Sequence, residues 1–146
     1  MEIKQVLFND ENWKKLIDFV KSSSWSESPI ITKNCEEYNY LDWERIFAAF
    51  ENDNIIGHCS LNNVDCVPNV DYKPYIQSVF VKKNYRGKRV SEIMLNIAIE
   101  YAKSLGFKEV YIVSGHINFY EKYGFTIIDE KKEYRDVLQG IYRKEI

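Results

Sequence analysis

Apolar residues along the chain alternate between strand-like runs and helical spacing, and this order predicts a mixed α/β fold. Residues 3–8 form a short apolar strand at the N-terminus. Asp10 then stands as the N-cap of a first helix, whose apolar face is formed by Trp13, Leu16, Ile17 and Val20. Residues 22–44 are mostly irregular in pattern, with a short second helix predicted over residues 33–40.

The most regular part of the chain is a strand followed by a turn and a long helix. Residues 75–81 are apolar and of strand length, after a long polar loop over residues 62–74. Beyond the turn, apolar residues recur at helical spacing until Gly106 supplies a stop: Val90, Ile93, Met94, Ile97, Tyr101 and Leu105. A strand over residues 110–113, a short helix over residues 117–123 and a closing hairpin over residues 126–131 and 141–145 complete the prediction.

The turn between that strand and that helix is strongly basic. Five cations fall within eight residues: Lys82, Lys83, Arg86, Lys88 and Arg89. From Lys82 onward, the first acidic residue is Glu92. Unpaired backbone N–H groups and the positive end of the helix dipole meet at a helix N-terminus, so such a turn can bind a phosphate. A solvated basic turn without a ligand is the alternative interpretation.

A second motif follows the strand at residues 110–113, in the run Ser-Gly-His-Ile-Asn-Phe-Tyr-Glu-Lys-Tyr-Gly-Phe that starts at Ser114. The order strand, Tyr-Arg-Gly-Lys turn, long helix, strand, Phe-Tyr-Glu-Lys-x-Gly-Phe resembles the GNAT superfamily of acyl-CoA-dependent N-acetyltransferases. The firm match runs over residues 76–128, and residues 45–50 and 55–61 are similar to the second and third strands of that fold. The resemblance implies one domain over residues 1–146. Its expected core is a mixed, mostly antiparallel twisted sheet of about six or seven strands with about four helices and a splayed fourth and fifth strand pair.

The sequence departs from the family pattern in three ways. The family's pyrophosphate loop is usually Arg/Gln-x-x-Gly-x-Gly/Ala, and alignment on Arg86 puts Arg89 and Ser91 at the two small positions. The strand over residues 75–81 has no Glu or Asp, although many members place a general base or its water relay there. Val113 stands where an Asn is frequent. Coenzyme binding is therefore better supported than any particular proton relay.

The resemblance also implies a set of site residues. Acetyl-CoA would be the acyl donor, with its pantetheine arm between the splayed strands and a backbone N–H near Val79 or Phe80 stabilising the oxyanion. The residues implied in coenzyme binding are Val79, Phe80, Val81, Arg86, Gly87, Lys88, Arg89, Val90, Ser91, Asn118 and Tyr120. No metal is expected, and only two histidines and no Cys-x-x-Cys pair are present.

Tyr120 matches the family's usual general acid. A tyrosine of ordinary pKa is a weak proton donor to an alkyl thiolate, so the hydroxyl acts either as the acid or as a hydrogen-bond donor to the departing sulfur. Packing in an aromatic segment is the other interpretation of Tyr120. His116 is the first candidate for the general base, since the dipole of the following helix would favour neutral imidazole. A water held by strand carbonyls or Asp71 is the alternative base, and His58, inside a strand, is interpreted as structural.

Composition and charge limit the classes of partner that the protein can have. With 146 residues, 45% apolar and 15% aromatic, the chain has the size and composition of one soluble domain, and the absence of a signal-like apolar segment favours the cytoplasm. Three cysteines are expected to be reduced and structural. Residues 1–75 carry a net charge of −6 and residues 76–146 a net charge of +4. This asymmetry fits an anionic coenzyme and a cationic amine acceptor, whereas the basic residues are too localised for a nucleic-acid face.

The sequence therefore predicts an N-acetyltransferase that moves the acetyl group of acetyl-CoA to a primary amine of a small molecule or peptide by direct attack. The expected state is a monomer or homodimer without a membrane or nucleic-acid partner. Two alternatives stay open on the same fold. One is a non-catalytic acyl-CoA-binding module, and the other is a subunit whose main role is assembly with a partner.

Overall fold

The computed structural model describes all 146 residues, which form three α-helices, two single-turn 3₁₀ helices and seven strands. The strands lie in the order β1-β2-β3-β4-β5-β7-β6, with β4 and β5 parallel and the β1–β2, β5–β7 and β6–β7 pairs antiparallel. The chain divides into two compact units. Unit 1 comprises Met1–Ser60 and Ser78–Ile97, and unit 2 comprises Leu61–Gln77 and Ala98–Ile146.

Unit 1 holds the early strands and helices. Its elements are β1 (Glu2–Val6), α1 (Glu11–Ser22), α2 (Ser28–Glu37), β2 (Arg45–Glu51), most of β3 (Asn54–Asn62), the end of β4 (Tyr75–Val81), η1 (Lys83–Tyr85) and the first half of α3 (Val90–Ser104). The predicted N-cap is confirmed, because Asp10 Oδ1 accepts hydrogen bonds from the backbone N–H groups of Asn12 and Trp13 at 2.7 and 3.0 Å. The predicted second helix begins and ends earlier than expected, since Pro29 lies in its first turn and Tyr38 leaves it in a left-handed conformation.

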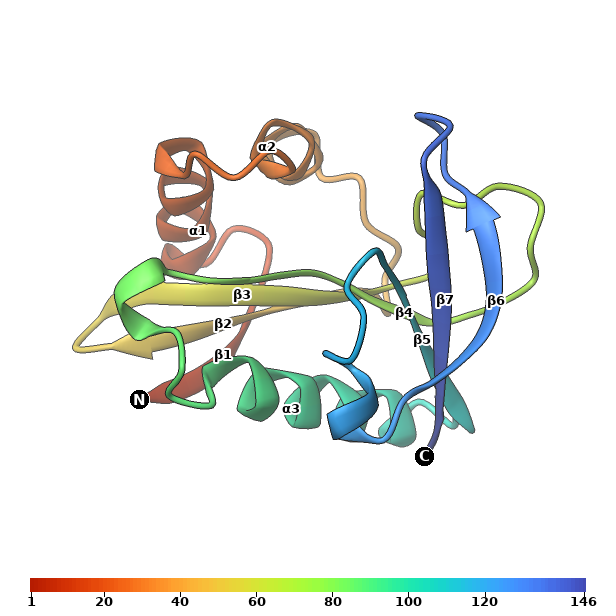
Figure 1. The fold of residues 1–146 in the computed structure, drawn as a ribbon. Helices are drawn as coiled ribbons and strands as arrows, with labels where there is room; N and C mark the ends of the chain where they lie inside the picture. Colours follow the sequence, from red (N-terminus) through yellow and green to blue (C-terminus); the bar gives the residue numbers. More distant parts are fainter. The chain divides into compact units, whose positions relative to one another are not determined.

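Both faces of the unit 1 strands are covered, as Figure 1 shows with α1 and α2 on one side of β1–β3 and α3 on the other. Ile46, Ala48 and Phe50 of β2 pack in a cluster with Leu16 and Val20 of α1. On the opposite face, Cys59 Sγ of β3 lies 3.9 Å from the Met94 carbonyl oxygen of α3. Strands buried on both faces read as continuous apolar runs, which is why β2 and β3 lack the simple alternation of a one-sided sheet.

Unit 2 contains the remaining parts: the end of β3, the start of β4, the second half of α3, β5 (Glu109–Ser114), η2 (Glu121–Tyr123), β6 (Thr126–Lys132) and β7 (Leu138–Glu145). Strands β5 and β7 pair antiparallel from Glu109↔Glu145 to Ser114↔Gly140. The parallel ladder between β4 and β5 has one residue pair, Tyr75↔Tyr111, which is the pattern that the predicted splayed pair requires. The helix predicted over residues 117–123 is wrong: only η2 forms, because Asn118 has a φ of +60° that no continuous α-helix accepts.

The loop at residues 63–74 belongs to the core of unit 2, although its sequence is largely polar. Val67 packs with Tyr75, Tyr111 and Ile141 in the buried cluster of this unit. Backbone N–H of Tyr134 donates to the Cys66 carbonyl at 3.1 Å, so the loop is tied to the β6–β7 turn.

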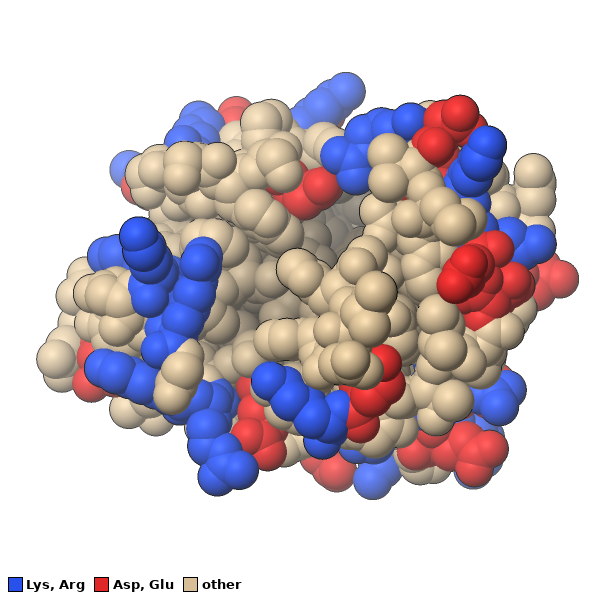
Figure 2. Space-filling view, in the orientation of Figure 1, with Lys and Arg blue, Asp and Glu red and all other residues tan.

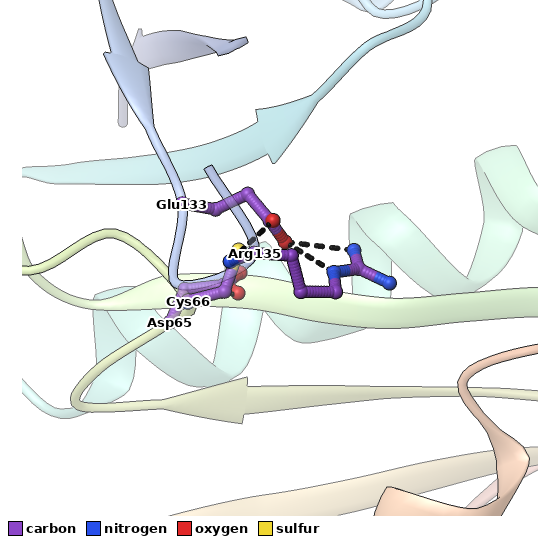
Figure 3. Close-up of polar contacts among 4 residues, drawn as sticks. All are labelled: Asp65, Cys66, Glu133 and Arg135. Atoms are coloured by element: carbon purple, nitrogen blue, oxygen red, sulfur yellow. Dashed lines mark hydrogen bonds and ion pairs between the residues drawn. The ribbon is translucent and has the colours of Figure 1, made fainter. Parts of the chain in front are cut away.

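The β6–β7 turn is organised around one buried acid. The side chain of Glu133 is 1% exposed. Figure 3 shows its contacts with Arg135. The backbone N–H of Arg135 donates to Glu133 at 2.8 Å, and the Nε and Nη2 groups of its guanidinium each lie 2.7 Å from Glu133 Oε2. Desolvation by burial acts to raise the pKa of Glu133, but the hydrogen bonds and charge of Arg135 outweigh it and lower that pKa. The acid is therefore ionised in the folded protein at neutral pH.

None of the helices is long and apolar enough to cross a bilayer. The prediction of a single domain stays a prediction.

Candidate active site

The basic turn predicted from the sequence, residues 82–89, lies in unit 1 and is called the cationic turn below. Its first residue is anchored, because Lys82 N–H donates to the Ile56 carbonyl of β3 at 2.7 Å. The 3₁₀ helix η1 follows directly, closed by the Arg86 N–H donating to the Lys83 carbonyl at 3.3 Å. A strand edge and one tight turn thus present the cations at the N-terminal end of α3.

All five cations of this turn are exposed: Lys82, Lys83, Arg86, Lys88 and Arg89. Figure 2 shows Lys and Arg side chains gathered over η1 and the start of α3. The Arg86 side chain makes two defined contacts. Its Nε donates to the Val81 carbonyl at 2.8 Å, and its guanidinium lies 5.5 Å from the centre of the Phe80 ring. Lys88 Nζ lies 5.5 Å from the centre of the Tyr85 ring. These contacts are exposed and weak, so the turn keeps its charge available to an anionic ligand.

Two residues of the cationic turn have left-handed backbone. Gly87 has a φ of +77°, and a Cβ placed on it would meet no atom within 4 Å. Arg89 has a φ of +64°, a conformation that glycine adopts without the steric cost that arginine meets. The Arg89 carbonyl accepts the Ile93 N–H at 3.1 Å, so Val90 is the first helical residue.

Arg89 precedes the helix, and its Nε donates to Glu92 Oε2 at 2.9 Å in an exposed i,i+3 ion pair. Ser91 lies partly buried in the first turn of α3, and Val90 is buried.

The second predicted motif lies in unit 2 at residues 114–124, called the tyrosine segment below. Tyr120 is 7% exposed. Its ring meets Phe119 edge-on at 4.9 Å, Phe125 at 6.1 Å and Tyr142 at 6.3 Å between centroids. The Tyr120 carbonyl accepts the N–H of Tyr123 at 3.0 Å and closes η2. Packing thus fixes the ring, and the hydroxyl is the only part of Tyr120 left to carry chemistry.

His116 and Asn118, the other two predicted residues of this segment, are exposed. The His116 N–H donates to Ser114 Oγ at 3.0 Å, and its carbonyl accepts from the Tyr142 hydroxyl at 3.0 Å. The Asn118 N–H donates to Glu121 Oε2 at 3.2 Å. Because no α-helix begins after His116, the helix dipole invoked for it from the sequence is absent.

The structure brings some predicted residues together and leaves others apart. In unit 1, Arg86 contacts Phe80 and Val81, and in unit 2 Tyr120 shares the tyrosine segment with His116 and Asn118. Asp71, the alternative base, is exposed in the loop at residues 63–74. Another acid of that loop, Asp65, contacts β4. With its amide oriented to satisfy its neighbours, Gln77 of β4 donates to both Asp65 oxygens at 3.1 and 3.2 Å.

Sequence reasoning missed His58 and Ser78 as functional candidates. His58 of β3 is buried, it hydrogen-bonds the backbone of Ser78, and its Nε2 has no partner. Ser78 has a φ of +56° in the middle of β4. A histidine inside an apolar run was the only available signal, and nothing local marks a serine as left-handed.

Other chemistries find little support. No group of three or more His, Cys, Asp or Glu side chains is placed to hold a metal ion. The three cysteines are free. Burial raises the pKa of Cys59 to about 12. Burial also raises the pKa of Cys66, and the nearby Asp65 charge adds to that rise. A hollow of about 570 Å³ between α1 and α2 is lined by both signs of charge, with Lys21 paired to Glu36 at 3.3 Å.

Comparison with known proteins gives one family. Residues 11–125 match the sequence model described as the acetyltransferase (GNAT) family. No curated protein matches the chain by sequence. Among solved structures, an aminoglycoside 6'-N-acetyltransferase complexed with coenzyme A superposes with a TM-score of 0.75 at 15% identity, over 99% of this chain and 97% of that one. An aminoglycoside 6'-N-acetyltransferase from Enterococcus faecium gives 0.75 at 16% identity, over 99% and 97%. A GNAT-family acetyltransferase from Staphylococcus aureus gives 0.65 at 22% identity, over 99% and 99%.

Proposed function

Because the chain belongs to the GNAT family of acetyltransferases, we propose that it transfers the acetyl group of acetyl-CoA to a primary amine of a small molecule or peptide. The observation that carries the proposal is the cationic turn. It places five exposed cations and a left-handed glycine at the N-terminal end of α3, where a polyanionic acyl donor is favoured by charge and by unpaired N–H groups.

The turn is proposed to bind the donor's phosphates. The N–H groups of Gly87, Lys88 and Arg89 and those of Val90 and Ser91 in the first turn of α3 are the proposed backbone donors. The open space above Gly87 supports this role, since backbone without a side chain can approach a ligand closely. Lys88 and Arg86 add charge that salt can screen. The backbone of Val79, Phe80 and Val81 is proposed to hold the pantetheine arm.

The proposed reaction is a direct attack of a neutral amine on the thioester carbonyl. A C–N bond forms, the carbonyl oxygen becomes an oxyanion that the Val79 N–H stabilises, and the C–S bond then breaks. Loss of one such donor costs about 3 kcal/mol of transition-state stabilisation. The amine proton passes to a base, for which His116 and a water-mediated carboxylate, Asp71 or Asp65, are candidates. The Tyr120 hydroxyl is proposed to donate to the departing sulfur, and Asn118 to contact the coenzyme nearby.

The acceptor is proposed to be a cationic amine. The solved neighbours that act on aminoglycosides support the inclusion of such compounds, and the acidic residues 1–75 contribute a favourable field. The test is a panel of aminoglycosides, polyamines and peptides incubated with acetyl-CoA, with coenzyme release and product mass as readouts. A product heavier than its acceptor by one acetyl group supports the proposal, and donor binding without any product on the whole panel counts against it.

A non-catalytic acyl-CoA-binding module is the second candidate. Arg89, left-handed and paired with Glu92 where the family has a small residue, favours it, as does the absence of a carboxylate in β4. An assembly subunit on the same fold would keep its association state after the coenzyme is removed. Binding without acetyl-CoA turnover, alone or with any amine, would identify the module.

A further inference from the structure

Ser78 carries the least expected backbone conformation in β4. Its φ of +56° lies in the left-handed region, in the middle of a strand and at a residue that is neither glycine nor asparagine. Such a conformation persists only where the surrounding structure holds it. The contact that holds Ser78 therefore identifies a residue with a positioning role.

That contact comes from His58 on β3. His58 is 2% exposed and hydrogen-bonds the backbone of Ser78, and its Nε2 has no partner. The ring nitrogen that meets Ser78 is therefore Nδ1. Burial lowers the pKa of His58 to about 4, against the smaller opposing effect of the Ser78 bond, so the imidazole is neutral at pH 7 and carries one proton. A neutral ring that donates to a carbonyl from Nδ1 leaves Nε2 unprotonated.

The ring of His58 is held in place by aromatic neighbours. Phe80 stacks on it at 5.7 Å with an interplanar angle of 28°, and Phe19 of α1 meets it edge-on at 5.9 Å and 86°. Trp25 lies 6.1 Å from His58 and stacks on Phe80 at 5.2 Å. Rotation of the His58 ring would disturb its stacking on Phe80, against which Arg86 of the cationic turn also lies.

The consequence for β4 follows from peptide geometry. In a trans peptide the C=O and the following N–H point in opposite directions, so a Ser78 carbonyl held toward His58 directs the Val79 N–H away from His58. We propose that His58 is a positioning residue that holds the Ser78 carbonyl through Nδ1–H and thereby aims the Val79 N–H at the oxyanion. The assignment of the Val79 N–H to the oxyanion rests on the proposed function, whereas the His58–Ser78 hydrogen bond does not.

The first test is the tautomer of His58, read from long-range ¹H–¹⁵N spectra of the uniformly labelled protein. The chain has two histidines, so a His116→Gln sample assigns the signals. The proposal predicts a neutral His58 with its proton on Nδ1. A proton on Nε2, or a doubly protonated ring at pH 7, would overturn it.

The second test compares two replacements of His58. His58→Asn keeps a side-chain N–H near the position of Nδ1, and His58→Phe keeps a stacking ring but has no donor. On an acceptor identified from the panel, His58→Phe should lower kcat roughly ten- to hundredfold with acetyl-CoA affinity within about twofold of wild type. His58→Asn should keep kcat within about threefold. Equal losses in both variants, or no loss in His58→Phe, would refute the positioning role.

A third variant separates positioning from simple loss of packing. Ser78→Gly removes the side-chain penalty at positive φ, so it should restore most of the kcat lost in His58→Phe and return the Val79 amide resonance toward its wild-type position. A His58→Phe protein that melts early and is not restored by Ser78→Gly would assign His58 to packing alone. If wild-type protein acetylates nothing, the tautomer and the Val79 resonance still decide the His58–Ser78 link, and only the proposed function fails.

Discussion

The cationic turn of unit 1 and the tyrosine segment of unit 2 carry the two parts of the proposed chemistry, and they are built in opposite ways. The turn is exposed, charged and held by a few backbone bonds, such as Lys82 N–H to Ile56 carbonyl. The tyrosine segment buries Tyr120 among Phe119, Phe125 and Tyr142. Binding in the turn can therefore change without affecting the fold, whereas a role for Tyr120 can be separated from packing only by removing its oxygen alone.

The largest effect is expected from Tyr120→Phe, which keeps the ring and deletes the hydroxyl. If the hydroxyl assists the departing sulfur, kcat should fall roughly ten- to a thousandfold with acetyl-CoA affinity unchanged. The melting temperature should fall by no more than roughly 5 °C, because at most one hydrogen bond is lost. Tyr123→Phe, in the same segment, is the matched control and should keep its kcat. A Tyr120→Phe enzyme with normal turnover would place Tyr120 in the core alone.

Charge reversal in the cationic turn comes next. Lys88→Glu should weaken acetyl-CoA binding about tenfold at low salt, with a change of under about 0.5 kcal/mol in the free energy of unfolding. Arg86→Glu should weaken binding similarly and cost slightly more stability, since Arg86 also donates to Val81. The loss should shrink as salt is added. Lys131→Glu, an exposed reversal on β6, is the control, and calorimetry that shows equal losses for all three would make the turn ordinary surface charge.

A third prediction uses the buried acid of unit 2. The pKa of Glu133 is lowered in the folded protein, so its contribution to stability is present above the unfolded pKa near 4.5 and is lost as pH falls through the lower folded value. Glu133→Gln should therefore lower the melting temperature more at pH 7 than at about pH 3. Acetyl-CoA affinity at pH 7 should be unchanged. A deficit of equal size at both pH values would show that ionisation of Glu133 is not what stabilises the β6–β7 turn.

The smallest effect is expected from Arg89→Gly. Glycine stabilises the folded protein because it relieves the positive φ. It also loses the exposed Glu92 ion pair and adds unfolded-state entropy, which are smaller destabilising effects. The net change in the free energy of unfolding should therefore be stabilising and below about 1 kcal/mol. Arg89→Ala is the comparison, because it loses the same ion pair without relieving φ and should be less stable than Arg89→Gly. Chemical denaturation measures both, and the reverse order would show that the ion pair outweighs the backbone.

Much of the fold could be predicted from the sequence because the long elements carry clear patterns. Asp10 and its helix, the helix from Val90, and the family order of strands all agree with the structure. The failures lie at left-handed residues. Asn118 stops the helix predicted over residues 117–123, and Tyr38 ends α2 early. Local propensity predicts neither, because tertiary contacts decide which non-glycine residues accept a positive φ.

Some residues of the candidate site could likewise be predicted from the sequence, and others could not. The exposed cations of the turn and Tyr120 could be named from sequence motifs, and their roles stay predictions. His58 and Ser78 could not, since their relation is a contact between two strands with no local signature. The position of Arg89 before the helix, with its pairing to Glu92, likewise emerges only from the folded chain.

The central claim is that the cationic turn binds the acyl donor while the Tyr120 hydroxyl serves turnover. The most direct test is calorimetric titration of acetyl-CoA into wild type and Tyr120→Phe over a salt series. The account predicts binding to both proteins with equal affinity, and an affinity that falls as salt rises because phosphate contacts are screened. Absence of binding to wild type, salt-independent binding, or loss of binding in Tyr120→Phe would contradict it.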